Sequence, residues 1–167
     1  MTCTWHADPT EFTFQGNVRH SFCANVRIHL LPQLLAVPHV QRITTIDMDS
    51  VFNKPFDLSR MPQPIGMFLR DTWDHSHRPE HKRLEVMCLA SMWWLDKSQV
   101  AYAQAVSDYI TACGPRWLID QEALYVTLRD MGLRDQTFDI ASMQGMVDWH
   151  MTPSGIMWTA KGHRKID

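Results

Sequence analysis

The chain has 167 residues, of which 45% are hydrophobic and 20% charged, the composition of an ordinary globular domain. Its formal net charge of −2 at pH 7 provides no overall positive field that would favour nucleic acid. No segment approaches the ~20 apolar residues needed to cross a bilayer, and the N-terminal region lacks the apolar stretch of a signal peptide. We therefore expect a single cytoplasmic domain over residues 1–167, with no membrane span and no nucleic-acid partner.

The cysteines indicate neither a zinc site nor a disulfide framework, because none of them stands in C-x-x-C spacing. The four positions are Cys3, Cys23, Cys88 and Cys113. The chain also has 11 methionines and 7 tryptophans, which predict a plastic, aromatic core. The alternative is that one or two tryptophans line a surface on which a sugar stacks.

The first third of the chain predicts one helix and one strand. Residues 1–18 show no clean periodicity and are expected to form an irregular lead-in. Apolar residues over 21–35 suit a helix with a wide buried face, kinked or broken at Pro32. The β-branched run at 43–46 predicts a buried strand at about 42–46, and the acidic sequence Asp47-Met48-Asp49 follows it directly.

The middle of the chain predicts a short buried strand, a polar loop and a longer apolar element. The strand is expected at 65–69, after a proline-rich turn, and the polar loop at 71–82. Residues 84–95 are almost continuously apolar, and their length is compatible with either a strand or a buried helix.

Two helices follow, each with start and stop signals. Asp96 and Gln99 can form a capping box for the first, which Gly114-Pro115 would end. Asp120 can cap the second helix, which would end at Gly132.

The last part of the chain contains short strand-like pieces at 138–140 and 156–158, followed by a basic tail at 159–167. Strands that alternate with helices predict an α/β domain with a mostly parallel or mixed sheet. Ligands of such sheets bind at the carboxyl ends of strands, where Asp47 and Asp49 are expected.

The acidic pair is a candidate metal site. Side chains alternate along a strand, so Asp47 and Asp49 would point the same way if the chain stays extended. Carboxylate oxygens suit Mg²⁺ or Mn²⁺, which proteins commonly hold together with substrate phosphates. The alternative interpretation is a solvated strand end.

Three segments, in order, resemble the glycosyltransferases of the GT-A fold. Residues 27–35 followed by 43–50 resemble the helix and D-x-D strand of that fold. Residues 117–125 are similar to its W-x-x-D-Q-x-A-L segment. Residues 148–150 with 156–165 are similar to the closing segment of bacterial members. The resemblance implies a GT-A-like (Rossmann-like) mixed sheet flanked by helices.

The resemblance also implies a function. The chain would be a metal-dependent glycosyltransferase that moves a sugar from a nucleotide-diphosphate donor to a glycan or cell-surface acceptor. Asp47 and Asp49 would hold Mn²⁺ or Mg²⁺, with His163 as third ligand and His150 as its alternative. The implied catalytic residues are Asp120 and Gln121, and the implied donor-binding residues are Arg27, Asp47, Lys161, Arg164 and Lys165. Helix capping by Asp120 and a solvated basic tail are the structural alternatives.

The chain departs from these transferases ahead of the acidic pair. Residues 1–46 contain no matching nucleotide-binding strand-helix-strand unit, so a partner chain or a missing N-terminal segment would complete the sheet. Two alternative functions stay open. One is a truncated, non-catalytic glycosyltransferase-like binding or interaction domain. The other is a metal-dependent phosphohydrolase that uses the same two aspartates.

A second group of potential ligands lies in the polar loop, where histidines and carboxylates suit Zn²⁺ or another transition metal. Its members are Asp71, Asp74, His75, His77, Glu80 and His81. Their spacing matches no closed structural zinc site, and a solvated polar loop is the alternative.

Overall fold

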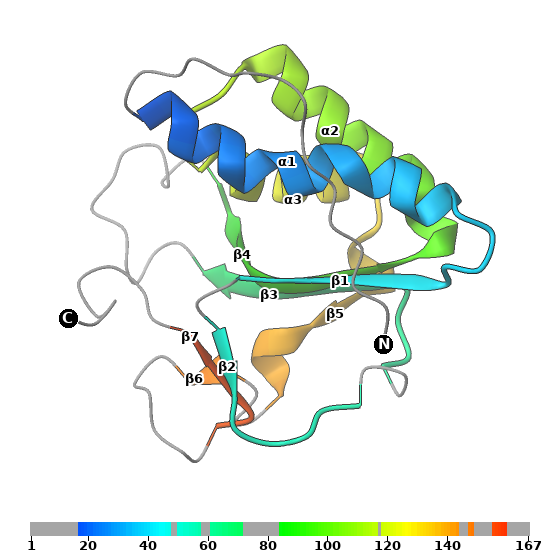
Figure 1. Ribbon diagram of the computed structural model, residues 1–167, viewed down its shortest axis with the longest axis vertical. Helices are drawn as coiled ribbons and strands as arrows, with labels where there is room; N and C mark the ends of the chain where they lie inside the picture. The colour runs from blue at the N-terminus through cyan, green and yellow to red at the C-terminus, as the bar shows by residue number, and fades with distance from the viewer. Residues whose placement is uncertain are drawn as a thin grey trace.

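Three α-helices and two β-sheets make up the part of the chain that the computed structural model describes (Figure 1). The described residues are 17–47, 50–57, 61–71, 84–116, 118–143, 147–148 and 155–159. The helices are α1 (Asn17–Ala36), α2 (Val100–Cys113) and α3 (Ile119–Asp130), with short 3₁₀ helices η3 (Lys97–Gln99), η4 (Arg134–Gln136) and η5 (Ile140–Ser142). The strands are β1 (Arg42–Ile46), β2 (Ser50–Phe52), β3 (Ile65–Asp71), β4 (Val86–Asp96), β5 (Thr137–Asp139), β6 (Val147–Asp148) and β7 (Met157–Thr159).

The larger sheet has the strand order β1-β4-β3-β5. Strand β4 is antiparallel to both β1 and β3, whereas β5 is parallel to β3. The prediction of an α/β domain with a mixed sheet is therefore confirmed, although antiparallel pairing predominates. Within the described residues, β1 is an edge strand, so the acidic sequence follows the outer strand of this sheet.

The three helices lie on one face of the larger sheet (Figure 1). The smaller sheet, with the order β2-β7-β6, lies on the other side. In it β2 is antiparallel to β7 and β6 is parallel to β7. The helices expected to flank the sheet thus cover only one of its faces. None of the helices in the described ranges is long and apolar enough to cross a membrane.

The main core lies between the helices and the larger sheet. Ile28, Leu31 and Leu35 of α1 recur at helical spacing and are at most 2% exposed, which is the pattern of a helix face turned to a core. The helix continues through Pro32 and begins at Asn17, earlier than expected. Residues 17 and 18 thus belong to α1, and the rest of the predicted lead-in lies outside the described residues.

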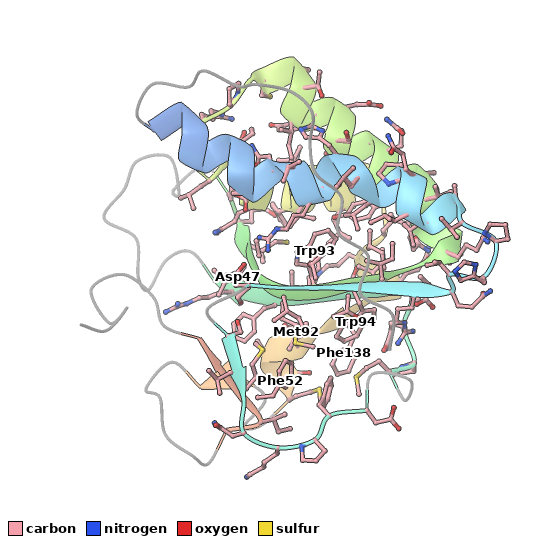
Figure 2. All side chains as sticks on the ribbon, viewed as in Figure 1. Asp47, Phe52, Met92, Trp93, Trp94 and Phe138 are labelled. Carbon is pink, nitrogen blue, oxygen red and sulfur yellow. The ribbon has the colours of Figure 1, made fainter. Side chains whose placement is uncertain are left out.

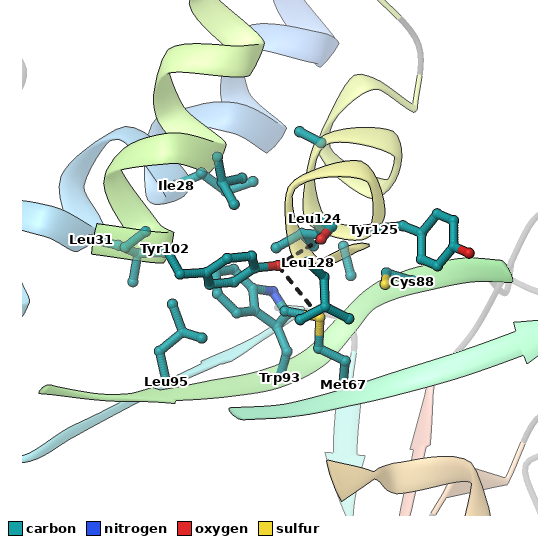
Figure 3. Close-up of a cluster of buried hydrophobic side chains, with 14 of the residues drawn as sticks. Ile28, Leu31, Met67, Cys88, Trp93, Leu95, Tyr102, Leu124, Tyr125 and Leu128 are labelled. Atoms are coloured by element: carbon teal, nitrogen blue, oxygen red, sulfur yellow. Dashed lines mark hydrogen bonds between the residues drawn. The ribbon is translucent and has the colours of Figure 1, made fainter. Parts of the chain in front are cut away.

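Tyr102 connects three elements of this core (Figure 3). Its side chain on α2 is 0% exposed, and its hydroxyl donates to the carbonyl oxygen of Leu124 on α3 at 2.6 Å. The same hydroxyl lies 3.8 Å from the sulfur of Met67 on β3. Burial raises the pKa of Tyr102 well above its ordinary value, so this hydroxyl stays protonated and keeps its donor role.

The apolar residues 84–95, whose sequence is compatible with a strand or a buried helix, contain most of the strand β4. It pairs with β1 on one side and β3 on the other, and both of its faces are covered. A central strand buried on both faces has a nearly continuous apolar sequence, which explains why periodicity alone did not distinguish it from a helix. Trp93 and Trp94 alternate across it, so Trp93 joins the helix-side core and Trp94 the cluster on the opposite face (Figure 2).

The predicted helix ends are confirmed, but both predicted acidic caps are wrong. Gly114 and Gly132 follow the helices with positive φ of 74° and 66°, a conformation that glycine adopts without steric cost. Asp96 makes no capping hydrogen bond, because its carboxylate pairs with Arg42 of β1. Asp120 lies inside α3, whose N-cap is Leu118.

Candidate functional site

Arg27, Asp47 and Asp120 meet at the carboxyl end of β1, and we call these three residues the Arg27 cluster. Arg27 Nη1 donates to Asp47 Oδ1 at 2.9 Å. Its Nη2 lies 4.0 Å from Asp120 Oδ2 and donates to the carbonyl oxygen of Ala90 at 3.1 Å. One guanidinium group from α1 therefore connects the end of β1, the first turn of α3 and the backbone of β4.

Asp47 is positioned by the backbone on both sides of it. Its amide donates to the carbonyl oxygen of Ser91 at 2.8 Å, which extends the pairing of β1 with β4 by one contact. Its own carbonyl oxygen accepts from the amide of Ser50, the first residue of β2, at 3.0 Å. Figure 2 shows Asp47 at the end of β1. Its side chain is 20% exposed, so the carboxylate is accessible from one side.

An irregularity in β4 supplies the backbone part of the site. Met67 of β3 lies opposite Trp93, but the next residue, Phe68, lies opposite Leu89. The intervening residues of β4 therefore bulge out of the β3 ladder, and two of their carbonyl oxygens are the ones that contact Arg27 and the Asp47 amide. Bulges of this kind commonly re-aim groups beside functional sites. Sequence motifs did not reveal this bulge, although the small residues Ala90-Ser91 interrupt an otherwise large and apolar segment there.

Asp120 is the most buried member of the cluster, with a side chain 11% exposed. Burial raises its pKa above the ordinary value of 3.8, and the charge of Asp47 acts in the same direction. The backbone hydrogen bond from Gln121 and the charge of Arg27 oppose this effect without cancelling it. Asp120 is thus a more strongly basic carboxylate than an exposed aspartate, and it sits beside a fixed positive charge.

Several polar atoms on the segments that form this site have no hydrogen-bond partner among the described residues. They are Arg27 Nε, Ser50 Oγ, Ser91 Oγ and Gln121 Oε1, all buried. Buried polar atoms are normally paired, so each exception calls for an explanation. These four atoms, on four segments around Asp47, give the site hydrogen-bonding capacity that the described residues do not use.

The predicted metal ligands are only partly covered by the structure. Asp47 is described, whereas Asp49, His163 and its alternative His150 lie outside the described residues, as do Lys161, Arg164 and Lys165. The histidine-rich loop also lies outside them, apart from the backbone of Asp71. No group of three potential His, Cys, Asp or Glu ligands occurs within the described ranges.

The described residues of the predicted metal site have side chains of the type that bind a hard cation. Asp47 and Asp120 offer carboxylate oxygens, the ligand type that Mn²⁺ and Mg²⁺ prefer. Two acidic side chains and one basic side chain make up the Arg27 cluster, so its acidic groups outnumber its basic group. A cation bound there would share the carboxylate of Asp47 with Arg27.

The described cysteines are unsuited to nucleophilic catalysis at this site. Cys88 is 0% exposed, and burial raises the pKa of its thiol to about 12. The thiolate is the reactive form of cysteine, so this side chain is inert near neutral pH. Cys113 is exposed at the end of α2.

No protein-family model matches the chain, and no curated protein is significantly similar to it in sequence. Function is therefore inferred from the three sequence motifs and from the geometry of the Arg27 cluster.

Proposed function

We propose that this chain is a GT-A-like, metal-dependent glycosyltransferase. It would bind a nucleotide-diphosphate sugar at the Arg27 cluster and transfer the sugar to a glycan or cell-surface acceptor. The observation that carries this proposal is that Arg27 contacts both Asp47 and Asp120. Each aspartate belongs to a different segment that resembles the transferases, and nothing in local sequence requires the two segments to meet.

Arg27 has a positioning role in this proposal. Two carboxylates close together repel each other, and the guanidinium group between them offsets that repulsion. Its bond to the Ala90 carbonyl fixes the guanidinium against β4, and through it the orientation of Asp47. Preorganised charges of this kind stabilise the charge that develops during a reaction without further rearrangement.

Asp120 has the properties of a proton acceptor. Its raised pKa makes it a better base for an acceptor hydroxyl than an exposed aspartate. Gln121, whose buried Oε1 has no hydrogen-bond partner among the described residues, would orient a sugar hydroxyl once its side chain turns toward the ligand. Mn²⁺ or Mg²⁺, when bound, would neutralise charge on the diphosphate leaving group. Lys161, Arg164 and Lys165 would add to that neutralisation.

The test is release of nucleoside diphosphate from a panel of UDP- and GDP-sugars by the full chain, with Mn²⁺ or with a chelator. We expect release with one donor, dependent on the metal and abolished in Asp47→Ala and Asp49→Ala. Asp135→Ala, at an exposed position in η4, is the matched control and should retain activity. Activity that survives Asp49→Ala would show that the metal assignment is wrong. Release of inorganic phosphate from simple phosphate esters would favour the phosphohydrolase instead.

A non-catalytic binding domain is the second candidate, and the position of β1 favours it. This strand is at the edge of the larger sheet in the described residues, and edge strands offer unpaired backbone groups to a partner chain. Calorimetry with a nucleotide sugar and Mn²⁺ separates the two candidates. Heat of binding to the well-folded chain supports the transferase, whereas its absence supports the binding domain.

A further inference from the structure

The outer edge of β1 has backbone groups that point away from the larger sheet. The Asp47 amide donates to the carbonyl oxygen of Ser91, its opposite residue when the register of β1 and β4 is continued by one step. Hydrogen-bonded and non-hydrogen-bonded pairs alternate along an antiparallel ladder. Thr44 and Ile46 are therefore non-hydrogen-bonded positions toward β4, and their amide and carbonyl groups point outward. No strand in the described part of the chain pairs with this side of β1.

Exposed apolar side chains gather on the elements that adjoin this edge. They are Leu30 and Leu34 of α1, Ile46 of β1, and Val51 and Phe52 of β2. The other large apolar side chains that are exposed among the described residues are Val100 and Met131, at the start of α2 and the end of α3. Groups of exposed apolar residues commonly mark sites of interaction. The edge of β1 thus combines outward backbone groups with apolar side chains.

Leu30 and Leu34 lie on the side of α1 that is turned to β1. They follow Arg27 in the sequence by three and seven residues, which places all three on one face of the helix. Arg27 reaches from this face to Asp47 at the end of β1, whereas His29 contacts α2. In Figure 1, α1 and β1 lie together in front of α3 and β3. The apolar face of α1 and the edge of β1 are therefore on the same side of the molecule.

We propose that the edge of β1 binds a second copy of this chain, so that the larger sheets of two copies join into one. With the two-fold axis at Thr45, Thr44 of each copy lies opposite Ile46 of the other, and their outward backbone groups exchange hydrogen bonds. A two-fold axis perpendicular to the joined sheet places both α1 helices on the same face of it. Leu30 and Leu34 of each copy would then be buried at the junction.

The charges at the two ends of β1 suit this antiparallel self-pairing. The strand begins at Arg42, and Asp47 follows it. Antiparallel pairing brings the basic beginning of each strand beside the acidic end of its partner, and such complementarity sets register and orientation. A second copy necessarily has the matching order of charges, which favours it over an unrelated strand. The proposal holds for a transferase and for a binding domain alike, because it concerns only how the chain assembles.

The experiment is sedimentation velocity of the full chain over a range of protein concentrations. We expect a reversible dimer. Thr44→Pro should raise the dissociation constant of the dimer by at least about tenfold, because each copy loses an amide donor. Proline is tolerated where the amide of an edge strand points outward, and far-UV circular dichroism checks that the variant is folded. Thr44→Val, which keeps the amide, is the matched control and should dimerise like the wild type.

Leu34→Glu tests the helical part of the interface and should also weaken the dimer. Its control is Met131→Glu, at a position of nearly equal exposure (42% against 41%) away from this edge, which should leave the dimer unchanged. A monomer at every concentration would overturn the proposal and assign the edge to a strand of a different chain. A dimer that is unchanged in both Thr44→Pro and Leu34→Glu would also overturn it, because the copies would then associate through another surface. If Thr44→Pro does not fold, the comparison of Leu34→Glu with Met131→Glu decides.

Discussion

Gly66 on β3 lies directly opposite Trp94 on β4, and a Cβ atom at position 66 would come within 2.1 Å of the Trp94 ring. The indole needs this space because its other contacts hold it in place. It stacks on Phe138 with ring centroids 5.9 Å apart, and the Arg42 guanidinium lies 5.8 Å from its centroid. Its Nε1 donates to the carbonyl oxygen of Gln63 at 3.2 Å. The absence of a side chain at position 66 is therefore a packing requirement of the apolar cluster around Trp94, on the face of the larger sheet opposite the helices.

Gly66→Ala is expected to lower the free energy of unfolding by about 1–3 kcal/mol, the usual cost of overpacking a core. Urea denaturation measures this change, with Ser98→Ala at an exposed position as the control. Trp94→Leu should lower the free energy of unfolding less in the Gly66→Ala background than in the wild type, because it removes the clash between the Cβ atom at position 66 and the indole ring. Strict additivity of the two substitutions would contradict the proposed clash.

Arg27→Met should destabilise the protein by about 1–3 kcal/mol at pH 7, because Asp47, Asp120 and the Ala90 carbonyl lose a shared partner. The loss should be smaller at acidic pH, because burial raises the pKa of Asp120 and this carboxyl is then protonated. Denaturation of wild type and variant at both pH values tests this, with Arg129→Met, in an exposed pair with Asp130, as the control. An equal loss of free energy of unfolding at pH 7 and at acidic pH would mean that Arg27 stabilises the fold by packing alone.

Asp120→Asn is expected to raise the free energy of unfolding near neutral pH. The pKa of Asp120 is higher in the folded state than its ordinary value of 3.8. The protonated carboxyl therefore contributes to the free energy of unfolding below pH 3.8, and this contribution is lost as the pH rises through the higher pKa of the folded state. The asparagine side chain does not titrate, so the variant should have the higher free energy of unfolding only as the pH rises above 3.8. Denaturation as a function of pH measures it, with exposed Asp130→Asn as the matched control. A gain of equal size at all pH values would contradict this mechanism.

Cys113 should react with iodoacetamide far faster than Cys88. The first side chain is exposed, whereas burial raises the pKa of the second to about 12 and also excludes the reagent. Mass spectrometry of a Cys3→Ser, Cys23→Ser variant follows both thiols separately. Urea should bring the Cys88 rate up to that of Cys113 over the same transition that unfolds the sheet. Rapid labelling of Cys88 in native buffer would show that the core around β4 opens locally.

Local sequence was sufficient for features whose cause is local. The β-branched run at 43–46 lies in β1, and the ends of α2 and α3 fall where glycine can adopt a positive φ. The motif that contains the acidic pair correctly predicted Asp47 at the carboxyl end of a strand, because a strand and the residue that follows it are contiguous. In these cases the deciding interactions lie within a few residues of each other.

Tertiary structure decided the features that depend on distant partners. Most of the apolar segment 84–95 lies in the strand β4, because β1 and β3 pair with it on both sides. Asp96 pairs with Arg42 instead of capping a helix, because a charged partner across the sheet is available to its carboxylate. The bulge in β4, which turns two carbonyl groups toward the Arg27 cluster, follows from register between strands. Sequence motifs identified Asp47 and Asp120 separately, but only the packing of α1 against the sheet and α3 shows that Arg27 joins them, since that contact links residues far apart in the chain.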